Sequence, residues 1–180
     1  MCGIYMHIGR LEFCTLCCIY VRRVELMFYV GLFGKSGVGK TTWLASHLQY
    51  IPTETLGIET RSVRFDGVNF IFHDTSGKIQ YDTLLESTIP EVNGVILMYD
   101  TSDWSSFALS LLWLKQFMGR EDTYCALLGV PNEPRIISSV DVALAVKPWI
   151  RQQKKIWYDE LEKTSFRSIL RFFIKSKKNN

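Results

Sequence analysis

A glycine-rich segment holds the residues of this chain best suited to chemistry. Residues 34–41 read Gly-Lys-Ser-Gly-Val-Gly-Lys-Thr and fit the pattern G-x-x-x-x-G-K-[ST]. Glycines let successive backbone N–H groups curl around an anion, and the start of a following helix adds partial positive charge. In this pattern Lys40 reaches the β and γ phosphates of a nucleotide, and the Thr41 hydroxyl binds Mg²⁺. The segment predicts a phosphate site, the alternative being a glycine turn without a ligand. The predicted contacts are Gly34, Lys35, Ser36, Gly37, Val38, Gly39, Lys40, Thr41 and Thr42.

Such a loop works only between a strand and a helix, and the neighbouring sequence predicts both. The apolar run 26–30 is typical of a strand, and 42–49 of a helix. The later pattern predicts strands at 58–65, 68–73, 94–100, 124–130 and 156–158, and helices at 104–118, 139–149 and from Phe166 onward. Asp66-Gly67 is a strong hairpin signal between the second and third strands. Alternating strands and helices predict a three-layer α/β fold that binds its ligand at the carboxyl ends of the strands.

Composition favours one folded domain. The chain has 180 residues, 47% of them hydrophobic, and a net charge of +3 that is too small to indicate nucleic-acid binding. Five cysteines, an odd and clustered set, indicate a reducing compartment, with a zinc site at residues 14–18 as the weaker alternative. We expect residues 1–24 to form a disordered extension or to reflect an upstream start, 25–176 to form the domain, and 177–180 a basic tail. No myristoylation or prenylation signal is present, so no lipid anchor is expected.

Two further segments make residues 26–176 resemble the small GTPases of the Ras superfamily. Thr55-Leu56-Gly57-Ile58-Glu59 is similar to the first switch, whose threonine completes Mg²⁺ coordination; Thr53 is the alternative. Asp74-Thr75-Ser76-Gly77 resembles the D-x-x-G of the second switch. The resemblance implies a P-loop fold with a mostly parallel six-stranded sheet and helices on both faces. It also implies GTP or GDP as ligand, Mg²⁺ held by Thr41, Thr55 and Asp74, and a Gly77 N–H that meets the γ-phosphate.

Two positions depart from the family pattern. Lys78 stands where the family has the glutamine that orients the attacking water, and lysine has three donors and no acceptor. We therefore expect very slow intrinsic hydrolysis and name no catalytic residue. At the expected guanine site, where the family has N-K-x-D, Asn132 and Glu133 follow Pro131. Both could read guanine, or both could cap a surface turn, so the choice between guanine and adenine stays open.

These departures, with the Trp113-x-x-x-Phe117 pair, resemble the atypical Rab-like subunits of the intraflagellar transport B complex. That resemblance implies a nucleotide-gated or structural subunit in the cytoplasm and cilium or flagellum. Its partners would be the coiled-coil core subunits seventy-four and eighty-one of the complex. The alternatives are a regulatory Rab- or Arf-like GTPase of vesicle traffic, a P-loop nucleotide kinase, and a scaffold that binds no nucleotide.

Overall fold

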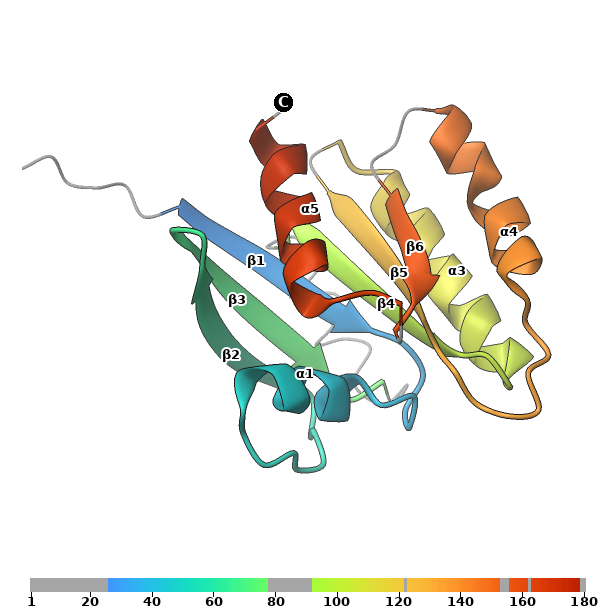
Figure 1. Cartoon of the computed structure of the whole chain (residues 1–180), viewed down its shortest axis with the longest axis horizontal. Helices are drawn as coiled ribbons and strands as arrows, with labels where there is room; N and C mark the ends of the chain where they lie inside the picture. The colour runs from blue at the N-terminus through green and yellow to red at the C-terminus, as the bar shows by residue number, and fades with distance from the viewer. Residues whose placement is uncertain (1–25, 78–91, 122, 153–155, 162, 179–180) are drawn as a thin grey trace, which may run out of the picture.

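The computed structural model describes residues 26–77, 92–121, 123–152, 156–161 and 163–178. Their strands form one six-stranded sheet, and the described helices flank it (Figure 1). The strands are β1 (Leu26–Phe33), β2 (Ile58–Phe65), β3 (Val68–Thr75), β4 (Gly94–Asp100), β5 (Tyr124–Val130) and β6 (Ile156–Glu160). The helices are α1 (Lys40–Leu48), α3 (Trp104–Met118), α4 (Ser139–Arg151) and α5 (Phe166–Lys178).

The sheet has the strand order β2-β3-β1-β4-β5-β6. Every neighbouring pair is parallel except β2–β3, which is an antiparallel hairpin. At its turn Asp66 and Gly67 both have positive φ, 47° and 78°, as the predicted Asp-Gly hairpin requires. Because five strands are parallel, their carboxyl ends share one edge of the sheet. The loops after β1, β3, β4 and β5 therefore meet at that edge.

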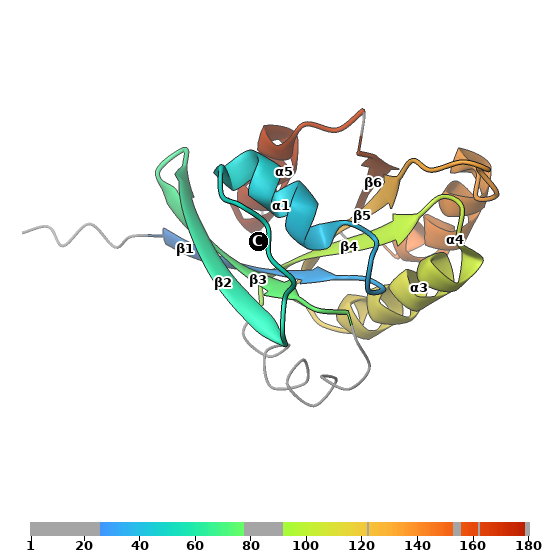
Figure 2. The ribbon, with the colours of Figure 1, turned by 90° about the horizontal axis from the view of Figure 1, so that it is seen from below.

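The core has two halves, one on each face of the sheet. Helices α1 and α5 cover one face, and α3 and α4 cover the other (Figure 2). Side chains of β4 alternate between them: Ile96 and Met98 pack toward α1 and α5, and Val95, Leu97 and Tyr99 toward α3 and α4. Strands buried on both faces read as continuous apolar runs, which is why β4 and β5 were visible in the sequence. The predicted three-layer fold is confirmed.

Differences from the sequence prediction are confined to the ends of elements. The first helix begins at Lys40 rather than at residue 42, and Gly39 is its amino cap with φ 90°. Strand β3 continues to Thr75 and β6 to Glu160. These extra residues are polar, so hydrophobic pattern could not include them, and ladder hydrogen bonding decides where the strands end.

Candidate functional site

The glycine-rich loop lies at the carboxyl edge of the sheet, between β1 and α1 (Figure 1). At Gly34 and Gly77 the neighbouring backbone lies too close for any side chain larger than that of glycine. A Cβ on Gly34 would lie 2.3 Å from the Met98 carbonyl oxygen, and one on Gly77 would lie 2.3 Å from the Gly34 carbonyl oxygen. The Ser36 N–H donates to the Gly77 carbonyl at 3.2 Å. The loop and the D-x-x-G segment thus touch directly, although residues 42–73 separate them in sequence.

Lys40 is held inside the loop by the loop's own backbone. Its Nζ donates to the carbonyl oxygens of Gly34, at 2.9 Å, and Lys35, at 3.1 Å. The side chain is buried, with 4% of the residue exposed, and this desolvation lowers its pKa to about 8, against a smaller raising effect of Asp74. A buried cation with only carbonyl partners is suited to an incoming anion, since a phosphate would supply the missing countercharge.

Three oxygen-bearing side chains converge beside this lysine. The hydroxyls of Thr41 and Thr55 lie 2.9 Å apart, and Thr55 Oγ1 donates to Asp74 Oδ2 at 3.2 Å. Asp74 is 1% exposed, and among the described residues its Oδ1 has no hydrogen-bond partner. Burial raises the pKa of this carboxyl, and the Thr41 hydrogen bond and Lys40 oppose the rise. Hydroxyl and carboxylate oxygens are the ligands that Mg²⁺ prefers, so these residues fit that ion.

A cavity of about 270 Å³ opens between these groups. Its walls come from the loop, the first turn of α1, residues 53–55 and the end of β3. Six of the nine predicted loop contacts line it: Ser36, Gly37, Gly39, Lys40, Thr41 and Thr42. Val38 instead packs into the core, and Gly34 and Lys35 contribute their carbonyls to Lys40. The exposed Thr53 lines the cavity as well, but it is Thr55 that reaches Thr41 and Asp74.

Sequence reasoning did not include three residues that line this cavity: Glu54, Thr75 and Ser76. The Thr75 hydroxyl donates to the Leu32 carbonyl at 2.6 Å, which fastens the end of β3 to β1. The Ser76 N–H donates to the Gly57 carbonyl at 2.9 Å and ties the first switch segment to the second. Thr75 and Ser76 occupy the variable positions of D-x-x-G, where the motif requires no particular side chain. Only the parallel pairing of β1 and β3 shows that they line the cavity.

Lys35 connects the loop to α3. Its Nζ lies 2.8 Å from Asp103 Oδ2 and 2.6 Å from the Ser105 hydroxyl. Asp103 is also the amino cap of α3, because its Oδ1 accepts from the Ser105 N–H at 2.8 Å. The hydrogen bonds from Lys35 and Ser105 hold the pKa of the Asp103 carboxyl well below its usual range. The Lys35 side chain therefore anchors the loop from outside the cavity.

We expect Lys35→Met to accelerate nucleotide release by only about two- to fivefold, because the ion pair is partly exposed and such pairs contribute little. Stopped-flow release of a fluorescent GDP, at low and high salt, measures the effect. Asp103→Asn should give a similar change, and the double variant should add nothing further. Fully additive effects would show that the pair does not hold the loop.

The loop after β5 uses its polar side chains internally. Asn132 Nδ2 donates to Asp100 Oδ2 at 2.8 Å, and its backbone N–H donates to the Thr101 hydroxyl at 2.9 Å. Glu133 Oε2 accepts from the Arg135 N–H at 2.9 Å. Neither Asn132 nor Glu133 lines the 270 Å³ cavity beside Lys40. Both side chains thus hydrogen-bond to neighbouring residues at this edge of the sheet. Lys78 lies outside the described residues.

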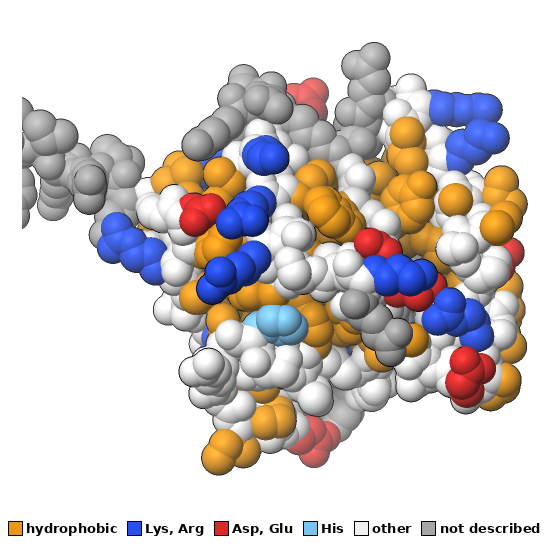
Figure 3. All heavy atoms as spheres, in the orientation of Figure 1, with side chains coloured by type: hydrophobic (Ala, Val, Ile, Leu, Met, Phe, Trp, Pro, Cys, Tyr) orange, Lys and Arg blue, Asp and Glu red, His pale blue; other side chains and the backbone are white. Residues whose placement is uncertain are grey.

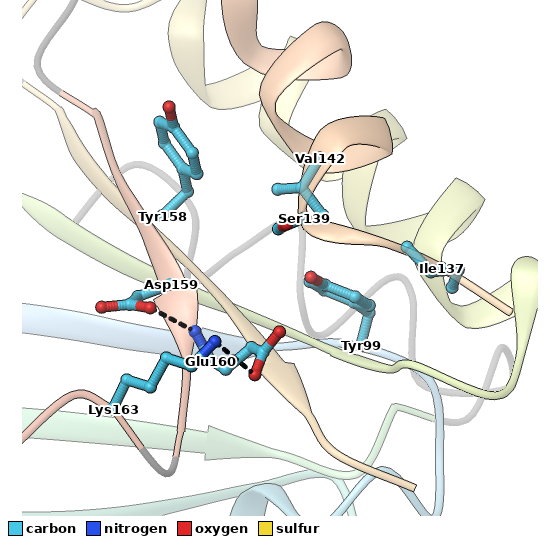
Figure 4. A pocket seen from close by; sticks show the side chains of 8 residues that line it. All are labelled: Tyr99, Ile137, Ser139, Val142, Tyr158, Asp159, Glu160 and Lys163. Carbon is cyan, nitrogen blue, oxygen red and sulfur yellow. Dashed lines mark hydrogen bonds and ion pairs between the residues drawn. The ribbon is translucent and has the colours of Figure 1, made fainter. Parts of the chain in front are cut away.

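A second cavity, of about 90 Å³, lies between β6 and the start of α4 (Figure 4). Ile137, Val142 and the ring of Tyr99 form its apolar side. Glu160 forms its polar side and is paired with Arg135 at 2.8 Å and Lys163 at 3.1 Å. The Lys163 and Arg135 contacts lower the pKa of the Glu160 carboxyl, against the raising effect of desolvation. Glu160 thus joins the loop after β5 to the one after β6.

Glu160→Gln is expected to lower the free energy of unfolding at pH 7 by about 1–2 kcal/mol, since two cations lose their charged partner. A carboxyl whose pKa is lowered by folding stabilises above its unfolded pKa, and this contribution disappears as pH falls through the folded pKa. The difference between wild type and Glu160→Gln should therefore shrink on acidification. Urea unfolding at pH 7 and pH 3 measures it; a pH-independent difference would contradict the ion-pair role.

The described part of the chain offers few other groups that could bind a metal or react. Its His, Cys, Asp and Glu residues form no group of three or more that could hold a metal ion. Cys125 is buried within β5, and burial raises the pKa of its thiol. The remaining cysteines and the extension at 1–24 lie outside the described residues. No helix among those described has the length and apolar character needed to cross a membrane.

Comparison with known proteins places the chain among Ras-related proteins. A model of the Ras family matches residues 30–173. Ras-related protein Rab-44 of Homo sapiens is 32% identical over 117 residues, covering 58% of this chain and 11% of that protein. RIC2 of Oryza sativa subsp. japonica is 30% identical over 117 residues, covering 61% and 54%. Rab-18 of Caenorhabditis briggsae is 33% identical over 102 residues, covering 52% and 48%. The matches span about half or less of these relatives.

Proposed function

Because this chain belongs to the Ras family, we propose that it is a GTP- and Mg²⁺-binding module whose nucleotide controls its contact with a protein partner. GTP would order the segment around Thr55 and the one that begins at Gly77. An order–disorder change of this kind draws its free energy from contacts that only the γ-phosphate makes. The proposal makes the module a switch or a long-lived structural subunit, depending on how fast it hydrolyses GTP.

The observation that carries the proposal is the cluster of Thr41, Thr55 and Asp74 beside Lys40. Thr55 comes from the segment before β2 and Asp74 from β3, yet the Thr55 hydroxyl hydrogen-bonds both to Asp74 and to Thr41 in the first turn of α1. The buried, unpartnered Oδ1 of Asp74 supports a cation there. A bound Mg²⁺ would supply charge neutralisation for the phosphates, and the chain's own contribution is to hold these oxygens and the lysine in place.

Titration with fluorescent GTP, GDP and ATP, with and without Mg²⁺, tests this function. Tight GTP and GDP binding that weakens without Mg²⁺ is the expected result, and Thr55→Ala should weaken GTP more than GDP. Ser62→Ala, at an exposed position in the middle of β2, is the matched control. Failure to bind any nucleotide at millimolar concentration would overturn the proposal.

We propose slow intrinsic hydrolysis on the basis of Lys78, which lacks an acceptor to orient the attacking water. Single-turnover hydrolysis of bound GTP measures it directly. Lys78→Gln should accelerate the reaction if the missing acceptor limits the rate. An unchanged rate would mean that another group limits it. Phosphoryl transfer to a nucleoside monophosphate would instead indicate a nucleotide kinase.

A nucleotide-free scaffold is the second candidate, and the engagement of Asn132 and Glu133 within their own loop favours it. The amide nitrogen of Asn132 and one carboxylate oxygen of Glu133 are thus already engaged within the loop. The two candidates differ in one respect that the titration resolves. The proposed module binds GTP in preference to ATP, whereas a scaffold binds neither.

For the partner we propose the coiled-coil subunits seventy-four and eighty-one of the intraflagellar transport B complex, and for the location the cytoplasm and cilium or flagellum. Support for this comes from the sequence resemblance. Trp113 and Phe117, which carry part of it, pack on Phe33 in the core and so bear on folding rather than on contact. A regulatory Rab- or Arf-like role in vesicle traffic fits the family equally well. Co-purification of this chain with the two subunits distinguishes the roles. Capture of this chain by the two subunits supports the transport role, and its absence contradicts that role.

A further inference from the structure

A row of three residues crosses β4, β5 and β6 beside the second cavity. Tyr99 of β4 pairs in register with Gly129 of β5, and Gly129 pairs with Glu160 of β6. Because Gly129 has no side chain, the Tyr99 ring lies across it: a Cβ on Gly129 would lie 2.6 Å from the Tyr99 hydroxyl oxygen. The Tyr99 side chain therefore extends over β5 toward β6, where it lines the cavity of about 90 Å³.

The Tyr99 hydroxyl is a polar group without a partner on a buried side chain. Tyr99 is 3% exposed, and among the described residues its hydroxyl makes no hydrogen bond. Figure 4 shows this hydroxyl pointing into the space between Ser139 and Glu160. Burial, and then the nearby Glu160 carboxylate, raise the pKa of Tyr99 to about 12, so the hydroxyl keeps its proton at neutral pH. Buried donors are generally paired, and this cavity leaves room for an acceptor from outside the described residues.

The charged groups beside the cavity already balance one another. Both carboxylate oxygens of Glu160 accept from Arg135, at 2.8 and 3.3 Å, and Oε2 also pairs with Lys163 at 3.1 Å. The Asp159 carboxylate accepts from the Glu160 N–H at 2.8 Å. Figure 3 shows Lys and Arg side chains next to Asp and Glu side chains over the end of β6. Two cations and two carboxylates sum to zero, so a neutral ligand fits this cavity better than a charged one.

The wall opposite β6 supplies a second hydroxyl. Ser139 is the first residue of α4 and lines the cavity, and its hydroxyl makes no hydrogen bond within the part of the chain that the structure describes. A serine hydroxyl can both donate and accept. Between the two hydroxyls the walls are apolar, from Ile137 and Val142. Since a cavity of about 150 Å³ holds a benzene molecule, a cavity of about 90 Å³ selects a smaller group.

We propose that this cavity binds a carboxamide, a compact neutral group with a hydrogen-bond acceptor and a donor side by side. Its carbonyl oxygen accepts from the Tyr99 hydroxyl, and its NH₂ group donates to the Ser139 hydroxyl. Its aliphatic stem contacts Ile137 and Val142. The carboxamide belongs either to a small free amide or to a glutamine or asparagine side chain of a protein partner. No residue that lines this cavity also lines the 270 Å³ cavity, so the two sites are separate.

Titration of the full chain with propionamide, followed by NMR of the protein, tests the proposal. We expect saturable shifts of the Gly129 and Ser139 amide signals, with a dissociation constant of about 1–50 mM for a ligand of about five non-hydrogen atoms. The shifts should be the same with and without GDP, so their absence would not bear on nucleotide binding. Propionate and propylammonium have a similar shape but carry a charge, and each should bind at least about tenfold more weakly. Shifts that stay linear up to about 200 mM, or equal binding of the charged ligands, would overturn the proposal.

Two substitutions test the contacts inside the cavity. Tyr99→Phe removes only the hydroxyl and should weaken propionamide binding about three- to tenfold. Tyr29→Phe is the matched control, because it removes a hydroxyl that lies beside Met27 Sδ on β1, and it should leave binding unchanged. Ser139→Leu directs a larger side chain into the cavity from an exposed position and should abolish binding. Circular dichroism melts establish that each variant is folded. Wild-type affinity in both Tyr99→Phe and Ser139→Leu contradicts the site.

Two tripeptides distinguish the sources of the carboxamide. Gly-Gln-Gly carries the group on a side chain, and Gly-Glu-Gly has a carboxylate in its place. If Gly-Gln-Gly binds at least about tenfold more tightly than propionamide, the cavity receives a partner's side chain, because the peptide backbone adds contacts. If it binds equally or more weakly, the site takes a small free amide. Tighter binding of Gly-Glu-Gly than of Gly-Gln-Gly contradicts the carboxamide in either form.

Discussion

Lys40→Met is expected to raise the dissociation constants for GTP and GDP by at least about 100-fold, equivalent to about 2.7 kcal/mol. The Lys40 ammonium is the buried cation that lines the 270 Å³ cavity. Methionine keeps the unbranched shape and most of the length of the lysine side chain but removes the charge. The melting temperature of the nucleotide-free protein should change little. Removing the cost of burying the charge offsets the loss of the hydrogen bonds to Gly34 and Lys35.

Lys35→Met is the matched control for this experiment. It removes a lysine from the same loop, but one whose ammonium contacts Asp103 outside the cavity. Equilibrium titration with fluorescent nucleotide, together with melts in the presence and absence of GDP, separates binding from folding. Equal losses from the two substitutions would show that loop stability, rather than a phosphate contact, explains the effect. If Lys40→Met bound nucleotide as tightly as the wild type, the proposed contact between Lys40 and a phosphate would be wrong.

Asp74→Asn is expected to make nucleotide release insensitive to Mg²⁺. In the wild type, chelation of Mg²⁺ should accelerate GDP release by at least about tenfold, because Thr41 and Asp74 would hold the ion and the ion would neutralise phosphate charge. The variant should release GDP at the fast rate with or without Mg²⁺. Without nucleotide it should be more stable by about 1 kcal/mol, since it removes a buried carboxylate with one unpartnered oxygen.

An exposed carboxyl provides the control for Asp74→Asn. Asp66 lies in the hairpin turn between β2 and β3, and its side chain is 55% exposed. Asp66→Asn should keep the Mg²⁺ dependence of GDP release, which stopped-flow fluorescence measures with and without EDTA. If Asp74→Asn kept that dependence as well, the ion would have to be held by other residues, and the Thr41–Thr55–Asp74 cluster would be structural.

Local sequence was sufficient to predict the phosphate loop and most of the fold. The glycines, Lys40 and Thr41 lie within eight residues, and their conformation depends on backbone freedom and on a helix that starts beside them. The apolar runs of β4 and β5 and the Asp-Gly turn after β2 were equally local signals. Thr55 and Asp74 could be proposed because their order and spacing around the loop resemble a known family.

Only the tertiary structure decided which distant residues meet. Lys35 reaches Asp103 across 68 residues, and Asn132 reaches Asp100 across 32, because β1, β4 and β5 end side by side. No local pattern encodes such neighbours; strand order and parallel pairing do. The same holds for the exposed Leu112 and Leu144, which belong to helices that only the sheet aligns. The sequence thus determined which chemical groups this protein has, and the packing of parallel strands decided which of their side chains lie in contact.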